Sequence, residues 1–378
     1  MSRIVLLYAD TGGGHRSAAE AIARGFEIDT PGRHDVSLVN AIAHMAFPYN
    51  QMERSYPAVV NGPRLLHQLS FHATNSRRRS WILRVLLRLA GANMARDVLV
   101  NHPADVYVSC SPIYTQVLPY YMARWHRATP FVVVATDLVS GHAFNYAPEA
   151  DLMLVPTEYA QREAIANQVA PESIVVTGQP VSPDIQARTR QASDALRLEL
   201  GFDHALPLVL LIGGGDGMGR LGATARAIAQ SDLRLQLLVV CGRNDAVKME
   251  LDQLPQRTVR MKTLGFVNTV PELMGLADIL VTKAGAATVA EAFIAGLPML
   301  IYDAIPGQED GNWRYVSREG AGAYKPEPAD IVAELRRLLA DTAALARMRL
   351  ASTRLAKPDA AIAIARAITH LSCAIAKS

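Results

Sequence analysis

Short, continuous apolar runs alternate along this chain with longer segments of helical periodicity. Runs without polar alternation are typical of strands that are buried on both faces of a parallel sheet. One series of runs covers residues 4–9, 106–109, 131–135, 152–155 and 174–176. A second series covers residues 208–212, 235–240, 279–282 and 299–302. The pattern predicts an α/β protein whose parallel strands are covered by helices on both sides.

The two series are separated by turn chemistry at residues 178–183, with the sequence Gly-Gln-Pro-Val-Ser-Pro. At 378 residues the chain is long enough for two domains that each bury a core. We therefore predict two doubly wound domains, an N-terminal one over residues 1–183 and a C-terminal one over residues 184–357. The Ala-rich segment 358–378 has helical periodicity and can pack on either domain, including back on the first.

The composition is that of an ordinary globular protein, with 50% hydrophobic and 19% charged residues. A net charge of +3 gives no reason to expect a nucleic-acid partner. The three cysteines are far apart and form no Cys-x-x-Cys pair, which argues against a disulfide framework or a zinc ribbon. No run approaches the roughly 20 apolar residues that cross a bilayer. We expect a cytoplasmic protein whose contact with a membrane is peripheral.

A glycine-rich turn follows the first predicted strand of each domain, at residues 12–14 and 213–215. Ligands of open α/β sheets bind at the carboxyl ends of the strands, where these turns lie. Neither turn fits G-x-G-x-x-G, because Ser17 and Met218 occupy the third glycine position. No G-x-x-x-x-G-K-[ST] loop occurs either, which argues against a dinucleotide dehydrogenase and a P-loop NTPase. Such turns can also be no more than tight strand-to-helix connections.

The segment 282–291 follows an apolar strand and opens a helix. Free backbone N–H groups and the positive end of the helix dipole suit a diphosphate there. Lys283 can add a full positive charge, and Glu291 lies where a carboxylate can accept both hydroxyls of a ribose. Two alternatives stay open: Lys283 can be an ordinary solvated lysine, and Thr288 with Glu291 has the spacing of a capping box.

The loop that begins at Pro306 carries Gln308, Glu309 and Asn312. Their polar side chains can donate hydrogen bonds to, or accept them from, sugar hydroxyls. The alternative is an ordinary polar loop without a ligand.

Several motifs, in this order along nearly the whole chain, resemble those of monogalactosyldiacylglycerol synthases and related processive diacylglycerol glycosyltransferases. They lie at residues 10–21, 213–219, 240–244, 283–291 and 306–312. A more distant similarity is to the peptidoglycan GlcNAc transferase, whose acceptor is a polyprenyl-linked lipid. The resemblance implies a GT-B fold, in which two Rossmann-like domains face each other across a cleft.

The resemblance also implies a UDP-sugar site. Glu291 would hold the ribose, and Lys283 with the following turn would hold the diphosphate. The residues implied in donor binding are Gly14, Gly214, Gly215, Phe266, Val267, Lys283, Gly285, Ala287, Thr288, Glu291, Gln308, Glu309 and Asn312. Within this set, Phe266 and Val267 would contact the uracil. The family usually has a glycine near position 286 or 287, where this chain has alanines.

The N-terminal domain would take the acceptor, whose hydroxyl must lose a proton as it attacks the sugar. His15 follows the first glycine turn, and a helix terminus there should lower its pKa and keep it neutral. Asp137, after the strand at 131–135, is the rival catalytic base. No Asp-x-Asp pair occurs, so we expect neither a metal ion nor another cofactor.

Residues 77–88 form the one conspicuous cationic cluster. On a helix, the arginines at 77, 84 and 88 share one stripe, whereas Trp81 lies with the apolar residues. Such a helix can lie on an anionic membrane, or it can bury its apolar side and expose its arginines. The residues predicted to contact the membrane are Arg77, Arg78, Arg79, Trp81, Arg84 and Arg88.

The resemblance thus implies inverting transfer of galactose or glucose from a UDP-sugar to 1,2-diacylglycerol. The expected partners are the UDP-sugar, the diacylglycerol or a related lipid, and an anionic membrane surface at the inner face of the cell membrane. Three alternatives stay open. They are GlcNAc transfer to a polyprenyl-linked intermediate, hydrolysing epimerisation of UDP-GlcNAc, and a UDP-sugar sensor without activity.

Overall fold

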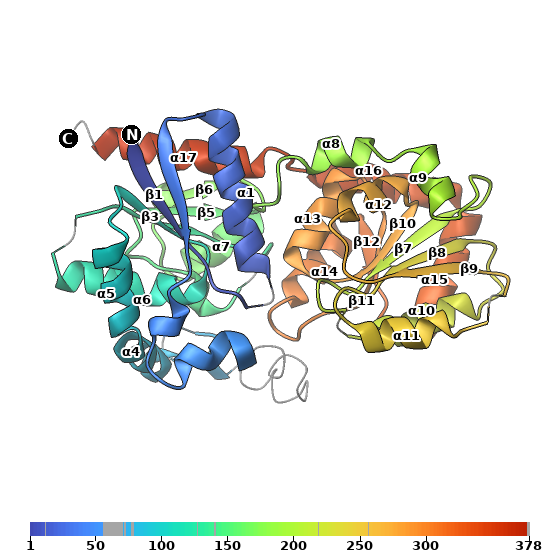
Figure 1. Cartoon of the computed structure of the whole chain (residues 1–378), viewed down its shortest axis with the longest axis horizontal. Helices are drawn as coiled ribbons and strands as arrows, with labels where there is room; N and C mark the ends of the chain where they lie inside the picture. Colours follow the sequence, from blue (N-terminus) through green and yellow to red (C-terminus); the bar gives the residue numbers. More distant parts are fainter. Residues whose placement is uncertain are drawn as a thin grey trace. The chain divides into compact units, whose positions relative to one another are not determined.

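The structure is a computed structural model that describes residues 1–11, 13–55, 71, 73–76, 79–126, 128–139, 141–217, 219–255 and 257–375. It divides into two compact units. Unit 1 contains Met1–Pro183, Pro306–Gln308 and Asp359–Ser378, and unit 2 contains Asp184–Ile305 and Glu309–Pro358. Each unit has a six-stranded sheet, and the strand pairs are parallel throughout (Figure 1). The predicted doubly wound α/β class is confirmed.

The sheet of unit 1 has the strand order β2-β1-β3-β4-β5-β6. Its strands are β1 (Ser2–Leu7), β2 (His34–Val39), β3 (Val106–Ser109), β4 (Phe131–Val134), β5 (Leu152–Val155) and β6 (Ile174–Val176). Its helices are α1 (Gly14–Asp29), α4 (Trp81–Ala90), α5 (Ala92–Asn101), α6 (Pro112–Arg124), α7 (Glu158–Ala166) and α17 (Ala360–Ile375). Short 3-10 turns lie at η1 (Ile42–His44), η2 (Tyr49–Gln51), η3 (Ala143–Asn145) and η4 (Pro171–Ser173).

Because successive strand residues point to opposite faces, the sheet of unit 1 feeds two cores. One core joins alternate residues of β1, β3 and β4 to α1 and α17, including Ile22, Phe26 and Ile364. The other joins the remaining strand residues to α5, α6 and α7. The terminal helix α17 therefore packs on unit 1, against α1. Gly25 permits this close approach, since a Cβ there would overlap the carbonyl oxygen of Ala361.

The sheet of unit 2 has the strand order β12-β11-β10-β7-β8-β9. Its strands are β7 (Leu208–Ile212), β8 (Gln236–Val240), β9 (Arg260–Leu264), β10 (Ile279–Lys283), β11 (Met299–Asp303) and β12 (Gly322–Tyr324). Its helices are α8 (Ile185–Arg190), α9 (Asp194–Glu199), α10 (Leu221–Ala229), α11 (Asp245–Asp252), α12 (Val270–Leu276), α13 (Ala286–Ile294), α14 (Asp310–Arg318), α15 (Pro328–Ala340) and α16 (Thr342–Leu355).

In each sheet the strand order reverses once, and this reversal locates a ligand crevice at the carboxyl ends of the flanking strands. In unit 2 the chain runs outward from β7 to β9, then returns to the other side of β7 with β10. The reversal point therefore lies between the turns that follow β7 and β10. In unit 1 the corresponding point lies between β1 and β3.

Candidate functional site

The turns after β7 and β10 approach each other closely in unit 2. Gly214 has a φ of +75°, which only glycine adopts readily. A Cβ on Gly214 would lie 3.4 Å from Cε of Lys283, so the glycine turn borders that side chain. The neighbouring Gly215 accepts a hydrogen bond from the backbone N–H of Arg243, after β8, at 2.9 Å. Two of the predicted phosphate-site glycines thus lie where the strand order reverses.

Lys283 is the last residue of β10 and is paired, not solvated. Its Nζ lies 2.5 Å from Oε1 of Glu309, and the two side chains are only 15% and 7% exposed. The second carboxylate oxygen of Glu309 accepts a hydrogen bond from the backbone N–H of Ile305 at 2.9 Å. The alternative of an ordinary solvated lysine is therefore wrong. A positive charge is held in a fixed place beside the turn after β10.

Helix α13 begins at Ala286, with Gly285 as its N-cap residue. No side chain in the described part of the chain caps this end, so its first N–H groups stay available to a ligand. Thr288 is the third helical residue and Glu291 the sixth, which places both inside the helix. The capping-box alternative for Thr288 and Glu291 is therefore wrong. Ala287 and Thr288 contribute two of the N–H groups at this open helix end.

Glu291 is half-buried in α13 and accepts no hydrogen bond from any described residue. Burial raises its pKa to about 7, and the positive charge of Arg188 on α8 opposes that rise. A carboxylate that is poorly solvated and lacks partners gains most from a ligand that donates hydrogen bonds.

Asn312 on α14 is fully buried, in contrast to its predicted place among sugar hydroxyls. Its Nδ2 donates to the carbonyl oxygen of Ala284 at 2.8 Å. Its Oδ1 has no partner among the described residues. The structure therefore gives Asn312 the task of bracing the turn after β10, and we correct the prediction that it contacts the sugar.

Phe266 follows β9 and is half-exposed, and Val267 beside it is partly buried. The guanidinium group of Arg243 lies 4.6 Å from the centre of the Phe266 ring. The same arginine pairs with Asp216 of the glycine turn at 3.2 Å. Arg243 therefore joins the glycine turn to the loop that was predicted to hold the uracil, a link that the sequence did not reveal.

Two predicted donor residues belong to unit 1 and not to unit 2. Gly14 is the exposed first residue of α1. Gln308 is half-buried in the segment Pro306–Gln308, which is grouped with unit 1. Their participation in donor binding stays a prediction.

In unit 1, His15 and Asp137 lie at the same edge of the sheet. His15 is the second residue of α1, and its Nδ1 lies 3.2 Å from Oγ1 of Thr136. Thr136 follows β4 and directly precedes Asp137. The carbonyl oxygen of Thr136 accepts a hydrogen bond from Nε2 of Gln179 at 2.8 Å. Thr136 and Gln179, neither of which was predicted, therefore fix the place of His15.

The pKa of His15 is lowered to about 4, mainly by burial, and the backbone of Cys110 partly opposes the shift. The predicted direction is thus confirmed, although its cause is burial and not the helix terminus. Neutral imidazole can accept a proton near pH 7.

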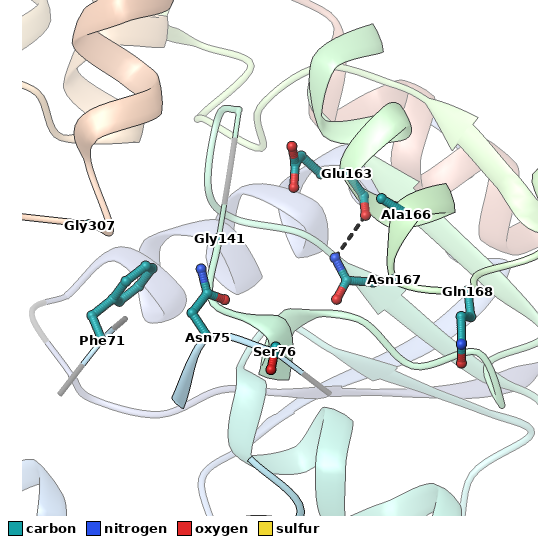
Figure 2. Close-up of a pocket in the computed structure, with 9 residues that line it drawn as sticks. All are labelled: Phe71, Asn75, Ser76, Gly141, Glu163, Ala166, Asn167, Gln168 and Gly307. Atoms are coloured by element: carbon teal, nitrogen blue, oxygen red, sulfur yellow. Dashed lines mark hydrogen bonds between the residues drawn. The ribbon is translucent and has the colours of Figure 1, made fainter. Parts of the chain in front are cut away.

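Asp137 accepts a hydrogen bond from Nδ2 of Asn145 at 2.5 Å. A Cβ on Gly141 would lie 2.7 Å from Oδ2 of Asp137, so the two residues are in direct contact. Gly141 also lines a pocket of about 240 Å³ in unit 1, together with Asn75 and Asn167 (Figure 2). Asp137 therefore contacts a residue that lines this pocket.

In helix α4 two arginines pack against the protein, whereas several large apolar side chains are exposed. This is the reverse of an ordinary surface helix. Arg84 is only 7% exposed, and it donates hydrogen bonds to Gln116 of α6 and to the carbonyl oxygen of Ala143. Arg88 is half-buried and donates to the carbonyl oxygen of Gln116 at 3.2 Å. Large apolar side chains are instead exposed, namely Trp81, Ile82, Val85, Leu86 and Leu89.

This arrangement corrects the prediction for the basic segment. Arg84 and Arg88 anchor α4 to the protein, so Arg84 cannot contact a membrane surface. The alternative, with a buried apolar side and solvated arginines, is wrong for Arg84 and Arg88, although Leu87 and Ala90 of α4 are buried. Arg79 is exposed, whereas Arg77 and Arg78 lie outside the described residues.

Within the described residues, no group of three or more His, Cys, Asp or Glu side chains could hold a metal ion. Among the described helices, none combines the length and the apolar character needed to cross a bilayer.

Solved structures with similar folds include MurG of Acinetobacter baumannii, with a TM-score of 0.61 and 15% identity over 100% of both chains. UDP-GlcNAc 2-epimerase of Neisseria meningitidis has a TM-score of 0.64 and 12% identity, over 98% of this chain and 100% of its own. These similarities concern the fold alone, and they confirm the predicted GT-B class.

Sequence relatives are more informative. Residues 15–181 match the monogalactosyldiacylglycerol (MGDG) synthase family, and residues 208–364 match the glycosyltransferase family 28 C-terminal domain. The probable monogalactosyldiacylglycerol synthase 2 of Oryza sativa subsp. japonica is 34% identical over 97% of this chain and 80% of its own length. Monogalactosyldiacylglycerol synthase 3 of Arabidopsis thaliana is 33% identical over 98% of this chain and 81% of its own.

Both of these relatives are named as chloroplastic proteins. The expected location, in the cytoplasm at the inner face of the cell membrane, is therefore wrong. Identity above 30% along nearly the whole chain establishes its kinship: the chain belongs to the monogalactosyldiacylglycerol synthase family of glycosyltransferases.

Proposed function

We propose that this chain transfers galactose from UDP-galactose to 1,2-diacylglycerol and makes a β-galactosyl glycolipid. One observation in the structure carries the nucleotide part of the proposal. In the described part of unit 2, the start of α13 has no side-chain cap and lies beside the fixed charge of Lys283, and Glu291 on the same helix has no hydrogen-bond partner. The galactosyl and diacylglycerol parts rest on the relatives, which are named for that product.

The donor would bind with its diphosphate at the first turn of α13. The N–H groups of Ala287 and Thr288, with the helix dipole and Lys283, stabilise the negative charge that builds up on UDP as it leaves. The backbone on both sides of this position carries no side chains, because the residues there are Gly214, Gly215 and Gly285. No metal ion is required for this step, because a positive charge and oriented dipoles are already present.

The nucleoside would lie along the side of unit 2 that carries Glu291 and the β9–α12 loop. Glu291 accepts hydrogen bonds from the ribose hydroxyls. Phe266 and Val267 contact the uracil, with Phe266 offering a half-exposed ring face for stacking. Glu309 keeps one carboxylate oxygen on Lys283 and contacts the galactose through its remaining lone pairs.

The acceptor hydroxyl would lose its proton to His15 of unit 1 as its oxygen attacks C1 of the galactose. The C1–O bond to UDP breaks on the opposite face, so a single displacement inverts the α-linked donor to a β-glycoside. His15 is suited to this role because burial keeps the imidazole neutral and Thr136 fixes its ring. Asp137 is the second candidate, because it borders the pocket of Figure 2 through Gly141.

Diacylglycerol resides in a bilayer, so the enzyme must meet a lipid surface. The exposed apolar side of α4 suits that surface, since fully burying a Leu, Ile or larger side chain contributes about 1.5–3 kcal/mol. Insertion of this side, anchored from behind by Arg84 and Arg88, replaces the arginine-led docking that the sequence suggested. Arg79 would add a screened attraction to anionic headgroups.

The experiment that tests the proposal is an assay of UDP-galactose, UDP-glucose and UDP-GlcNAc, each against diacylglycerol and against a polyprenyl-linked acceptor. The expected result is transfer of galactose to diacylglycerol at the highest kcat/KM of the set. Transfer of GlcNAc to the polyprenyl lipid would favour the cell-wall alternative. Turnover of UDP-GlcNAc without any lipid would indicate an epimerase, and UDP binding without turnover in any combination would indicate a sensor.

A further inference from the structure

The side chain of Arg188 on α8 makes three hydrogen bonds within unit 2, all to groups more than 75 residues away in the sequence. Its Nε and Nη2 each lie 2.9 Å from an oxygen of Glu272, the two-pronged geometry of a strong arginine–carboxylate pair. Nη2 also donates to the carbonyl oxygen of Asn268 at 2.5 Å. Asn268 ends the loop that contains Phe266 and Val267, so Arg188 fixes one end of the proposed uracil loop.

The helix that carries Arg188 is itself held rigidly. Helix α8 packs on α12 so closely that a Cβ on Gly275 would overlap the carbonyl oxygen of Thr189. Arg188 directly precedes Thr189 and bonds to Glu272 on the same helix α12. The guanidinium group of Arg188 therefore has little conformational freedom, and its positive charge has a fixed position.

The charge of Arg188 acts on the carboxyl group of Glu291. Glu291 lies on α13, and α8 also contacts this helix. Among the described residues, Arg188 is the one charged group with a marked effect on the Glu291 carboxyl. Helix α16 packs on α13 as well, but its arginines 349 and 354 are paired with Asp278 and Glu319. Arg347 on the same helix is exposed.

We propose that Arg188 is a positioning residue for the nucleotide, which holds the 265–268 loop in place and favours the ionised form of Glu291. The inference rests on the proposed function, since it presumes that Glu291 and this loop hold the nucleoside. An ionised carboxylate offers one acceptor oxygen to each ribose hydroxyl, whereas protonation turns one of these oxygens into a donor and weakens the hydrogen bonds. Because burial raises the pKa of Glu291 to about 7, loss of the Arg188 charge raises it further and removes the acceptor at neutral pH.

Calorimetric titration of UDP into the full chain between pH 6 and 8.5 tests the proposal. In the wild type, UDP affinity should rise with pH as Glu291 ionises. Arg188→Met should weaken UDP binding at pH 7 by on the order of tenfold or more and move the rise to higher pH. Arg188→Lys keeps the charge but loses the two-pronged pair, so it should restore the wild-type pH profile while the affinity stays reduced. Arg190→Met, an exposed arginine on the same helix, is the matched control and should match the wild type.

Glu291→Gln distinguishes the role of Arg188 from the existence of the nucleotide site. It should weaken UDP binding and abolish the pH dependence, and adding Arg188→Met to it should then produce no further change with pH. A wild-type pH profile in Arg188→Met, together with the expected loss in Glu291→Gln, would overturn the role of Arg188 and leave the nucleotide site intact. Unchanged UDP affinity in a folded Glu291→Gln variant would instead refute the proposed nucleotide site.

Discussion

The ε-amino group of Lys283 lies 2.5 Å from the carboxylate of Glu309, in a pair that is almost fully withdrawn from solvent. Removing one partner of a buried pair leaves the other charge uncompensated and costs about 3–5 kcal/mol. Lys283→Met should therefore lower the free energy of unfolding by about that amount, and adding Glu309→Gln should recover most of it. Urea denaturation followed by circular dichroism measures both.

UDP affinity should respond differently from stability. Calorimetry should find that Lys283→Met weakens UDP binding by about 1.5–3 kcal/mol, and that the added Glu309→Gln does not restore it. Lys248→Met is the matched control, because Lys248 pairs with Asp252 at an exposed position on α11. Lys248→Met should change the free energy of unfolding by less than about 1 kcal/mol and leave the UDP affinity unchanged. Recovery of affinity along with stability in the double variant would mean that Lys283 is only structural.

The choice between the two candidate bases can be made by kinetics. His15→Ala should lower kcat by roughly 10²- to 10⁴-fold, the usual contribution of a general base, while UDP affinity stays near that of the wild type. Asp137→Asn should have a much smaller effect. If Asp137→Asn causes the large loss and His15→Ala does not, the two roles are reversed.

The pH profile provides a second test of the base. His15 must be neutral to accept a proton, and its pKa is lowered to about 4. Protonation of His15 should therefore reduce kcat only as the pH falls toward 4, well below the ordinary range of histidine. A loss of kcat centred near pH 6.5 that is absent from the residual activity of His15→Ala would contradict the burial of this ring.

Exposed apolar residues on α4 should control binding to lipid. Replacing Trp81, Ile82 and Leu89 with serine should release the protein from anionic vesicles at both low and high salt, because insertion is not screened. Arg79→Ser should weaken sedimentation only at low salt. Leu350→Ser, at an equally exposed apolar position on α16, is the control and should sediment like the wild type. Normal sedimentation of the triple variant would place the membrane contact elsewhere.

Transfer should continue after treatment with EDTA. The proposed site supplies a lysine and an open helix end for the diphosphate, in the place where metal-dependent transferases use clustered carboxylates. Assays with and without EDTA should give the same kcat. A loss on chelation that Mg²⁺ or Mn²⁺ restores would refute this part of the mechanism.

The sequence predicted the central strands well and three edge strands not at all. Every predicted apolar run became a strand, often to within one residue. The missed strands β2, β9 and β12 each lie at the edge of a sheet. An edge strand has only one neighbouring strand, so β2 mixes exposed with partly buried residues and never forms a continuous apolar run. A continuous apolar run indicates only those strands that are buried on both faces.

Local patterns were weaker guides to the site. The spacing of Thr288 and Glu291 fits a capping box, yet the N-cap residue of α13 is Gly285, three residues before the supposed cap Thr288. The amphipathic pattern of α4 was recognised, but periodicity cannot tell which face packs on the protein. Arg84 decides this through Gln116, a partner 32 residues away. Arg188 was missed for the same reason, since its role depends on residues that only the fold brings near.

Product analysis shows whether the chain makes a β-galactosyl diacylglycerol. The purified chain is incubated with UDP-[¹⁴C]galactose and vesicles that contain diacylglycerol, and the extracted lipid is treated with α- or β-galactosidase. We expect label in a monogalactosyl diacylglycerol that β-galactosidase releases and α-galactosidase does not. Label in the lipid that only α-galactosidase releases would contradict inversion, and no label in diacylglycerol would contradict the proposed function itself.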